Sequence, residues 1–244
     1  MMKNFSQIYS EERKKEDKET LWVYYVTRPI SFWITPLFIK MGFSANQVSV
    51  LGMVVGIISS GLIIFGNYWM VLLGAVLLEL WLVLDSVDGN VARIRKTPTL
   101  LGKFLEEING AMMSALFFLS IGFAASKIPG FLPLFINIPF YWFMILGILT
   151  SFFVIFRHLA TAHFHSIFFA GKQYEPEPIF EKSSFSFLYK TAIKFLGVYS
   201  LAQPLLILAV VFNLLGLYTI IYFLMHLMVT AGILIFLLLK AKNN

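Results

Sequence analysis

Four carboxylates lie at the adjoining ends of two apolar runs: Asp85, Asp88, Glu106 and Glu107. An acid at the edge of a hydrocarbon span is costly, so its presence there favours a functional role. Asp85 and Asp88 are three residues apart, so in a helix they project from one face. Carboxylate oxygens suit Mg²⁺ or Mn²⁺, and the chain has no cysteine for a softer metal. We therefore predict that Asp85, Asp88 and Glu106 hold Mg²⁺ or Mn²⁺.

Small residues surround these acids. Gly89 and Ala92 continue the face of the two aspartates, and Gly102 lies one turn before the first glutamate. They leave room for a ligand, and Arg93 supplies a positive charge beside it. A metal, a small-residue face and an arginine together are what a charged diphosphate donor needs. The structural alternative is that the acids only cap helices or pair with Arg93 and Arg95.

The pattern resembles a known signature: Asp85-x2-Asp88-Gly89-x2-Ala92-Arg93-x8-Gly102-x3-Glu106 is similar to that of the CDP-alcohol phosphotransferases. These are integral membrane enzymes that move a phosphoalcohol or phosphatidyl group from a CMP-linked donor to an alcohol. The stretch RPISFWITPLFIKMGFSANQVSV also resembles the segment before the first membrane helix of that family.

The resemblance implies a role for each matched residue. The three acids would hold one or two divalent ions across the diphosphate of the donor. The cytidine nucleotide would lie against Gly89, Ala92 and Gly102, and Arg93 would offset phosphate charge. The resemblance also implies a homodimer.

The chain departs from the family pattern at two positions. The family has Asp where this chain has Glu106, and a second Asp, the usual catalytic base, where this chain has Gly110. Glu106 is long enough to ligate a metal with one oxygen and reach the acceptor with the other, so we predict that it is also the catalytic base. Glu107 points about 100° away around the helix. An acceptor that is already ionised would need no base.

Composition indicates an all-α integral membrane protein, since 59% of residues are hydrophobic, 13% are charged and the mean hydropathy is +0.80. We expect residues 1–45 to form a cytoplasmic segment with an interfacial amphipathic helix, in which Pro29 and Pro36 exclude one long uninterrupted helix. Residues 46–244 would form a six-helix transmembrane catalytic domain. Its predicted spans are 47–65 (capped by Ser44 or Asn46), 68–93, 102–126, 139–169, 185–212 and 217–240. The polar link 171–184 would be a connector, or a flap beside the site.

The distribution of positive charge predicts the orientation. Eighteen of the nineteen Lys and Arg residues fall on one side of the predicted spans, and only Lys127 falls on the other. By the positive-inside rule both termini and the acidic hairpin are cytoplasmic, in a bacterial or archaeal cell membrane. The net charge of +6 is therefore assigned to a membrane surface and an anionic donor rather than to nucleic acid.

Three further polar residues are candidates for substrate binding. Arg157 and His158, at the end of the fourth predicted span, suit the phosphate of an acceptor or a lipid, although they are equally typical of side chains that reach toward headgroups. Asn109 lies on the face of Glu106. Glu79, inside the second span, is expected either to stay protonated or to hydrogen-bond a group on a neighbouring helix, such as Ser59, Ser60 or His226.

Three readings of function follow. The first is a transferase that moves a phosphoalcohol or phosphono-alcohol group from a CDP-alcohol or CMP-phosphonate to a lipid, sugar or glycan acceptor, with release of CMP. The second is a membrane prenyltransferase, which also holds a diphosphate through Mg²⁺. The third is a non-catalytic relative that binds nucleotide or lipid, which the glycine at position 110 favours.

Overall fold

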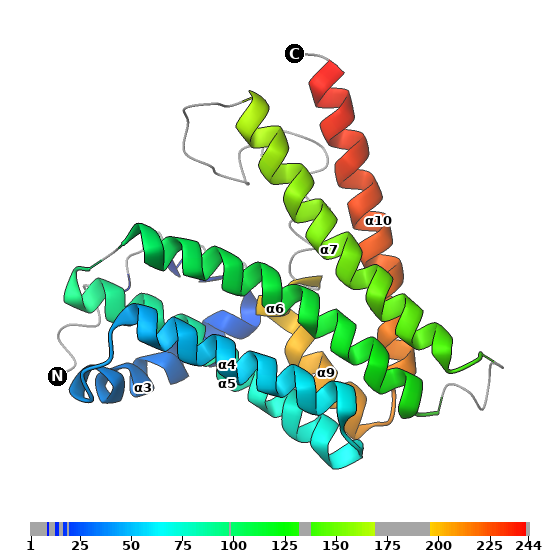
Figure 1. Ribbon diagram of the computed structural model, residues 1–244, viewed down its shortest axis with the longest axis horizontal. Helices are drawn as coiled ribbons and strands as arrows, with labels where there is room; N and C mark the ends of the chain where they lie inside the picture. The colour runs from blue at the N-terminus through cyan, green and yellow to red at the C-terminus, as the bar shows by residue number, and fades with distance from the viewer. Residues whose placement is uncertain are drawn as a thin grey trace.

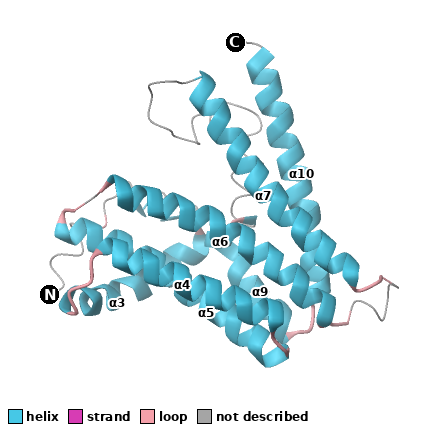
Figure 2. Cartoon of the chain, viewed as in Figure 1, coloured by secondary structure: helices cyan, strands magenta, loops and turns pink. Residues whose placement is uncertain are grey.

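The computed structural model describes Tyr9, residues 13–14, 17–18, 20–97, 99–131, 138–168 and 196–242, except for the side chain of residue 165. Every regular element in this part of the chain is helical (Figure 2). The elements are η2 (Val23–Thr27), α3 (Arg28–Lys40), α4 (Ala45–Phe65), α5 (Tyr68–Arg95), α6 (Leu100–Lys127), α7 (Tyr141–Phe168), η5 (Val198–Ala202), α9 (Gln203–Val211) and α10 (Leu215–Lys242). The all-α prediction is confirmed.

Side-chain caps fix where three of the long helices begin. Ser44 and Gln47 form a reciprocal capping box at the start of α4, which decides between the two caps expected there. Asn67 accepts a hydrogen bond from the backbone of Met70 at the start of α5, and Thr99 accepts one from Gly102 at the start of α6. Short connections between capped helices make α4, α5 and α6 antiparallel neighbours.

Five helices are long and apolar enough to cross a membrane: α4, α5, α6, α7 and α10. They agree with five of the six predicted spans. The remaining span, 185–212, is described only from residue 196, and its described part is the shorter apolar stretch Val198–Val211. The link 171–184 lies outside the described residues.

The long helices pack in a chain of contacts: α4 against α5 and α6, α6 against α7, and α7 against α10 (Figure 1). Two glycines bring the backbones of α6 and α7 together, because a Cβ built on Gly147 would lie 2.5 Å from the Cα of Gly122. From this crossing α7 diverges from α6 toward its own C-terminal end (Figure 1).

The N-terminal segment packs its polar side inward. Ser31 and Thr35 of α3 are buried, whereas Trp33 and Leu37 are exposed. An exposed apolar face on α3 is consistent with the predicted position of this helix at the membrane interface. A π-helical turn precedes α3, so the segment is not one uninterrupted α-helix; the expectation that Pro36 also interrupts it is wrong, since α3 continues through this proline to Lys40.

The partner expected for Glu79 is also wrong. Its carboxylate accepts a hydrogen bond of 2.8 Å from the indole nitrogen of Trp22, next to η2. The hydroxyls of Ser59 and Ser60 have no hydrogen-bond partner within the described part of the chain, and the ring of His226 packs against Phe118 with centroids 4.6 Å apart. A sequence pattern could not indicate Trp22, because 57 residues separate it from Glu79. The bond fastens the N-terminal segment to α5.

Candidate active site

A cavity of about 700 Å³ lies between the start of α4, the end of α5 and the start of α6. Six of the residues predicted for the metal and the nucleotide line it: Asp88, Gly89, Ala92, Arg93, Gly102 and Glu106. Its wall also holds Ser49, Lys96 and Lys103, so cations and carboxylates share the same space. We call this space the first cavity.

Each of the two aspartates accepts a hydrogen bond from another side chain. Asp88 is buried, and one carboxylate oxygen accepts a hydrogen bond from the hydroxyl of Ser49 on α4. Asp85 accepts a hydrogen bond of 3.4 Å from the amide nitrogen of Asn109, whose oxygen in turn accepts one of 3.1 Å from the indole of Trp81. Neither Asp85 nor Asn109 is among the residues that line the first cavity. Asn109 is fully buried, which places it behind the acids.

Two glycines leave space that side chains would fill. A Cβ on Gly89 would lie 3.1 Å from the guanidinium of Arg93. A Cβ on Gly102 would lie 3.1 Å from the side-chain oxygens of both Asn46 and Thr99. The absence of a side chain at both positions therefore keeps polar groups accessible from the cavity.

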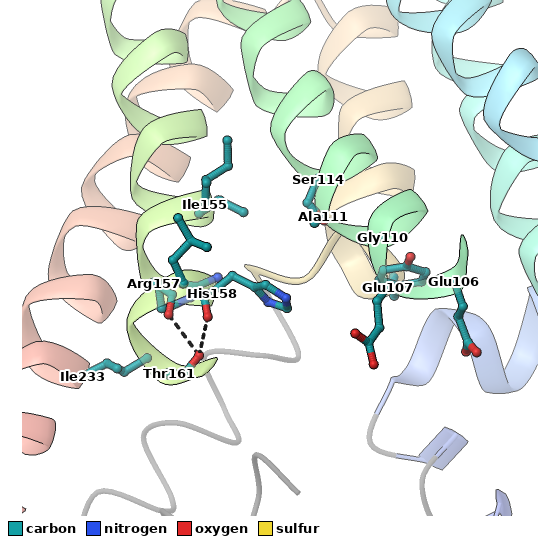
Figure 3. A pocket seen from close by; sticks show the side chains of 13 residues that line it. Glu106, Glu107, Gly110, Ala111, Ser114, Ile155, Arg157, His158, Thr161 and Ile233 are labelled. Carbon is teal, nitrogen blue, oxygen red and sulfur yellow. Dashed lines mark hydrogen bonds between the residues drawn. The ribbon is translucent and has the colours of Figure 1, made fainter. Parts of the chain in front are cut away.

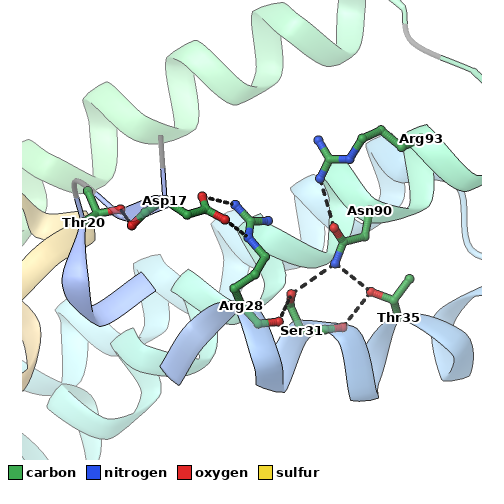
Figure 4. A network of polar contacts seen from close by, with 7 residues as sticks. All are labelled: Asp17, Thr20, Arg28, Ser31, Thr35, Asn90 and Arg93. Atoms are coloured by element: carbon green, nitrogen blue, oxygen red, sulfur yellow. Dashed lines mark hydrogen bonds and ion pairs between the residues drawn. The ribbon is translucent and has the colours of Figure 1, made fainter. Parts of the chain in front are cut away.

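A polar network positions Arg93 (Figure 4). The guanidinium donates a hydrogen bond of 2.9 Å to the amide oxygen of Asn90, and the amide nitrogen of Asn90 donates to the hydroxyls of Ser31 and Thr35, each at 3.1 Å. Because Ser31 and Thr35 belong to α3, this buried network ties the arginine of the site to the N-terminal segment.

The same segment carries a buried ion pair (Figure 4). Two nitrogens of Arg28 donate to the two carboxylate oxygens of Asp17, at 2.7 and 2.8 Å. A buried charge left without its partner is strongly destabilising. The pair therefore fixes how the residues before α3 approach the bundle.

A second cavity, of about 430 Å³, lies where α6 and α7 diverge (Figure 3). Glu106, Glu107 and Gly110 line it from α6, and Arg157 and His158 line it from α7, across the opening from the glutamates. Thr161 donates hydrogen bonds to the backbone carbonyls of Arg157 and His158. The wall also includes Tyr199 of η5.

Among the described residues, Glu106 is the one that lines the walls of both cavities. It is exposed, as is Glu107, which lines only the second cavity. A carboxylate that borders both cavities can interact with ligands in each. This position distinguishes Glu106 from its neighbour.

The acids of the site have the chemistry of ligands for a divalent cation. Asp85, Asp88 and Glu106 lie close enough to repel one another electrostatically, and carboxylate oxygens are the ligands that Mg²⁺ prefers. Among the described residues no three acidic or histidine side chains converge as a ready-made metal site. Mg²⁺ is usually held by one or two carboxylates together with substrate phosphates, so the residues present fit a metal that arrives with a diphosphate.

Sequence reasoning missed three residues that the tertiary structure brings to the site: Ser49, Asn90 and Tyr199. Ser49 and Asn90 are small polar residues within largely apolar helices, which is a signal for a specific partner. Tyr199 had no such signal, because it is one of ten tyrosines in an aromatic-rich chain.

Comparison with known proteins identifies the family of the chain. The family model for CDP-alcohol phosphatidyltransferase matches residues 43–234. The matched range contains every residue that lines the two cavities. A comparison with individual curated proteins found no match. Since the family match covers more than half of the sequence, the chain belongs to the CDP-alcohol phosphatidyltransferase family, whose members transfer a phosphoalcohol group from a CDP-alcohol.

Proposed function

We propose that the chain is a membrane transferase that takes a CMP-linked donor in the first cavity and an acceptor in the second. The donor is a CDP-alcohol or a CMP-phosphonate, and the acceptor is a lipid, a sugar or a glycan. The observation that carries the proposal is the position of Glu106 on the walls of both cavities. A group transfer needs one place where both substrates meet, and Glu106 marks it.

In the first cavity, the cytidine nucleotide lies against Gly89, Ala92 and Gly102. Arg93 offsets phosphate charge, held by its hydrogen bond to Asn90. Asp85, Asp88 and Glu106 would hold one or two ions of Mg²⁺ or Mn²⁺. An ion bound there would neutralise diphosphate oxygens and make CMP a better leaving group. We assign Asn109 a supporting role in place of direct substrate binding, because it is buried and holds Asp85.

In the second cavity, Arg157 and His158 bind the anionic part of the acceptor or a lipid phosphate. Arginine forms strong charge-assisted hydrogen bonds with phosphate, which supports this assignment. The opening between α6 and α7 lies beside apolar helix faces, where Ile155 and Leu159 are exposed. That setting suits an acceptor that carries an apolar portion.

The transfer is a displacement at the phosphorus atom that bears the alcohol. The acceptor oxygen attacks this phosphorus, and the bond from phosphorus to the oxygen that bridges to CMP breaks. CMP departs with the bridging oxygen, and the proton of an alcohol acceptor passes to the carboxylate of Glu106. Removal of such a base typically costs about 10²–10⁴-fold in rate.

The proposal is tested with purified protein in detergent or nanodiscs. We expect CDP to bind with an affinity that falls on addition of EDTA and in Asp88→Asn. A panel of CDP-alcohols and a CMP-phosphonate is then tested with lipid, sugar and sugar phosphate acceptors, and at least one pair should release CMP.

Glu79→Gln is the matched control, since this acid lies on the same helix as Asp88 but bonds to Trp22. CDP affinity unaffected by both EDTA and Asp88→Asn would refute the donor site, and binding without CMP release from any pair would favour a non-catalytic relative. Release of pyrophosphate from a prenyl diphosphate would favour the prenyltransferase reading.

A further inference from the structure

The space beside Gly110 is filled from another helix. A Cβ built on this glycine would lie 2.9 Å from the hydroxyl oxygen of Tyr199 and 3.9 Å from the ring carbon that bears it. The first distance is shorter than side-chain carbons adopt in proteins, and the second is an ordinary contact. The hydroxyl, and not the ring, therefore excludes a side chain at position 110.

Tyr199 is held in this orientation by irregular backbone and by packing. It belongs to the π-helical turn η5, in which Ser200 leaves helical geometry with φ −122° and ψ −124°. Such π-helical turns occur frequently at functional sites. The ring packs against Trp81, with centroids 5.5 Å apart, and Trp81 donates its indole hydrogen bond to Asn109. The tyrosine thus joins the group of side chains that holds Asp85.

The hydroxyl also lies beside the acids of the site. Tyr199 lines the second cavity with Glu106, and it lies within electrostatic range of Asp85, Asp88 and Glu106. Glu106 and Gly110 are four residues apart on α6, so they share one face of the helix. A neutral phenol beside carboxylates is suited to donate a hydrogen bond.

We propose that Tyr199 supplies the polar group that position 110 lacks and that its hydroxyl donates a hydrogen bond to the reacting oxygen of the acceptor. This inference rests on the proposed function, because it needs an acceptor in the second cavity. The hydrogen bond orients the acceptor oxygen between Glu106 and the phosphorus atom of the donor. It leaves the proton transfer to Glu106, since a phenol is a poor base at neutral pH.

The test compares Tyr199→Phe, Gly110→Ala and the double variant, with Tyr141→Phe as control because Tyr141 is exposed and lines neither cavity. CDP affinity, thermal stability, and kcat and KM for the acceptor are measured with the donor and acceptor pair that gives the wild type its highest rate of CMP release. Tyr199→Phe should lower kcat/KM for the acceptor by about 10- to 100-fold, the range expected for loss of one hydrogen bond to a reacting group. CDP affinity and stability should stay at wild-type values.

The double variant tests the contact itself. Gly110→Ala should reduce activity in the wild type, where the methyl group meets the hydroxyl. In Tyr199→Phe the same change should add little, because the nearest ring carbon is then at an ordinary contact distance. Equal losses from Gly110→Ala in both backgrounds would overturn the inference. So would an unchanged kcat/KM in Tyr199→Phe, or a loss of CDP affinity or stability that matches the loss of rate.

Failure of the proposed function gives a different result. A folded wild-type protein that releases no CMP from any donor and acceptor pair would refute the proposed function, and this inference with it. A wild type that binds CDP and releases CMP, beside a fully active Tyr199→Phe, would refute the inference alone.

Discussion

The hydroxyl of Ser49, one turn into α4, donates a hydrogen bond to the buried carboxylate of Asp88 on α5. The two residues are 39 positions apart, and both line the first cavity. The bond fixes one oxygen of the carboxylate. Ser49 therefore orients an acid that the proposed function requires.

Replacing this serine should weaken nucleotide binding. We expect Ser49→Ala to reduce the affinity for CDP in the presence of Mg²⁺ by about tenfold, since a hydrogen bond to a charged group contributes about 1.5–3 kcal/mol. Isothermal titration calorimetry measures the effect. Ser60→Ala is the control, because Ser60 is a buried serine of the same helix whose hydroxyl has no partner among the described residues. Equal affinity in Ser49→Ala and the wild type would contradict this role.

The two glutamates at the start of α6 should differ in function. Glu106→Gln should lower turnover by about 10²–10⁴-fold with a smaller effect on CDP binding, because it removes the proposed base. Glu107→Gln should change turnover little, because Glu107 lines only the second cavity. Steady-state CMP release separates the two variants. If Glu107→Gln abolishes turnover and Glu106→Gln does not, the assignment of the base is reversed.

The crossing of α6 and α7 should depend on Gly147. Gly147→Ala places a methyl group 2.5 Å from the Cα of Gly122 and 2.8 Å from the carbonyl oxygen of Phe118, and backbone cannot move aside cheaply. Overpacking of this kind costs about 1–3 kcal/mol, so the thermal midpoint in detergent should fall. Gly61→Ala should leave it unchanged or raise it, since a Cβ there meets nothing within 4 Å and alanine favours the helix. A fall of the same size in both variants would show that the close approach is unimportant.

The contact between Trp22 and Glu79 should hold the N-terminal segment in place. Trp22→Phe removes the indole nitrogen and leaves the carboxylate of Glu79 without this donor. We expect faster proteolysis of the residues before α3 and a modest loss of stability of about 1–3 kcal/mol. Limited proteolysis followed by mass spectrometry measures the first effect. Trp33→Phe is the control, because Trp33 lies on α3 and its side chain is exposed. Identical cleavage of both variants would argue against an anchoring role.

The charge distribution predicts that the α5–α6 hairpin faces the cytoplasm. The chain has no cysteine, so single cysteines report accessibility without background. Leu100→Cys, at the start of α6, and Lys242→Cys, at the end of α10, should react with an impermeant maleimide only after cells are permeabilised. Phe131→Cys, beyond the opposite end of α6, should react in intact cells. Labelling of Leu100→Cys from outside would reverse the orientation and with it the access of a cytoplasmic donor.

The sequence by itself determined the class of the protein and which acids we propose for its site. Apolar runs of membrane-spanning length favour helices, because a helix satisfies its backbone hydrogen bonds within the segment. Helical periodicity alone indicates that Asp85 and Asp88 share a face, and that Glu106 lies near the start of the next helix. The small residues beside them were predictable for the same reason, because each lies within a turn of an acid. Local pattern was sufficient for all of these features.

Only the tertiary structure decided which residues hydrogen-bond to the acids and which residues form the second cavity. Ser49 and Trp81 reach the aspartates from positions that no local pattern connects to them, directly in one case and through Asn109 in the other. Tyr199 fills the space beside Gly110 because a distant helix leaves regular geometry at η5. Two glycines let α6 and α7 approach closely at their crossing. The second cavity lies where these helices diverge from that crossing. Hydrogen bonds and packing between helices depend on how the helices are placed, and a linear sequence does not specify that placement locally.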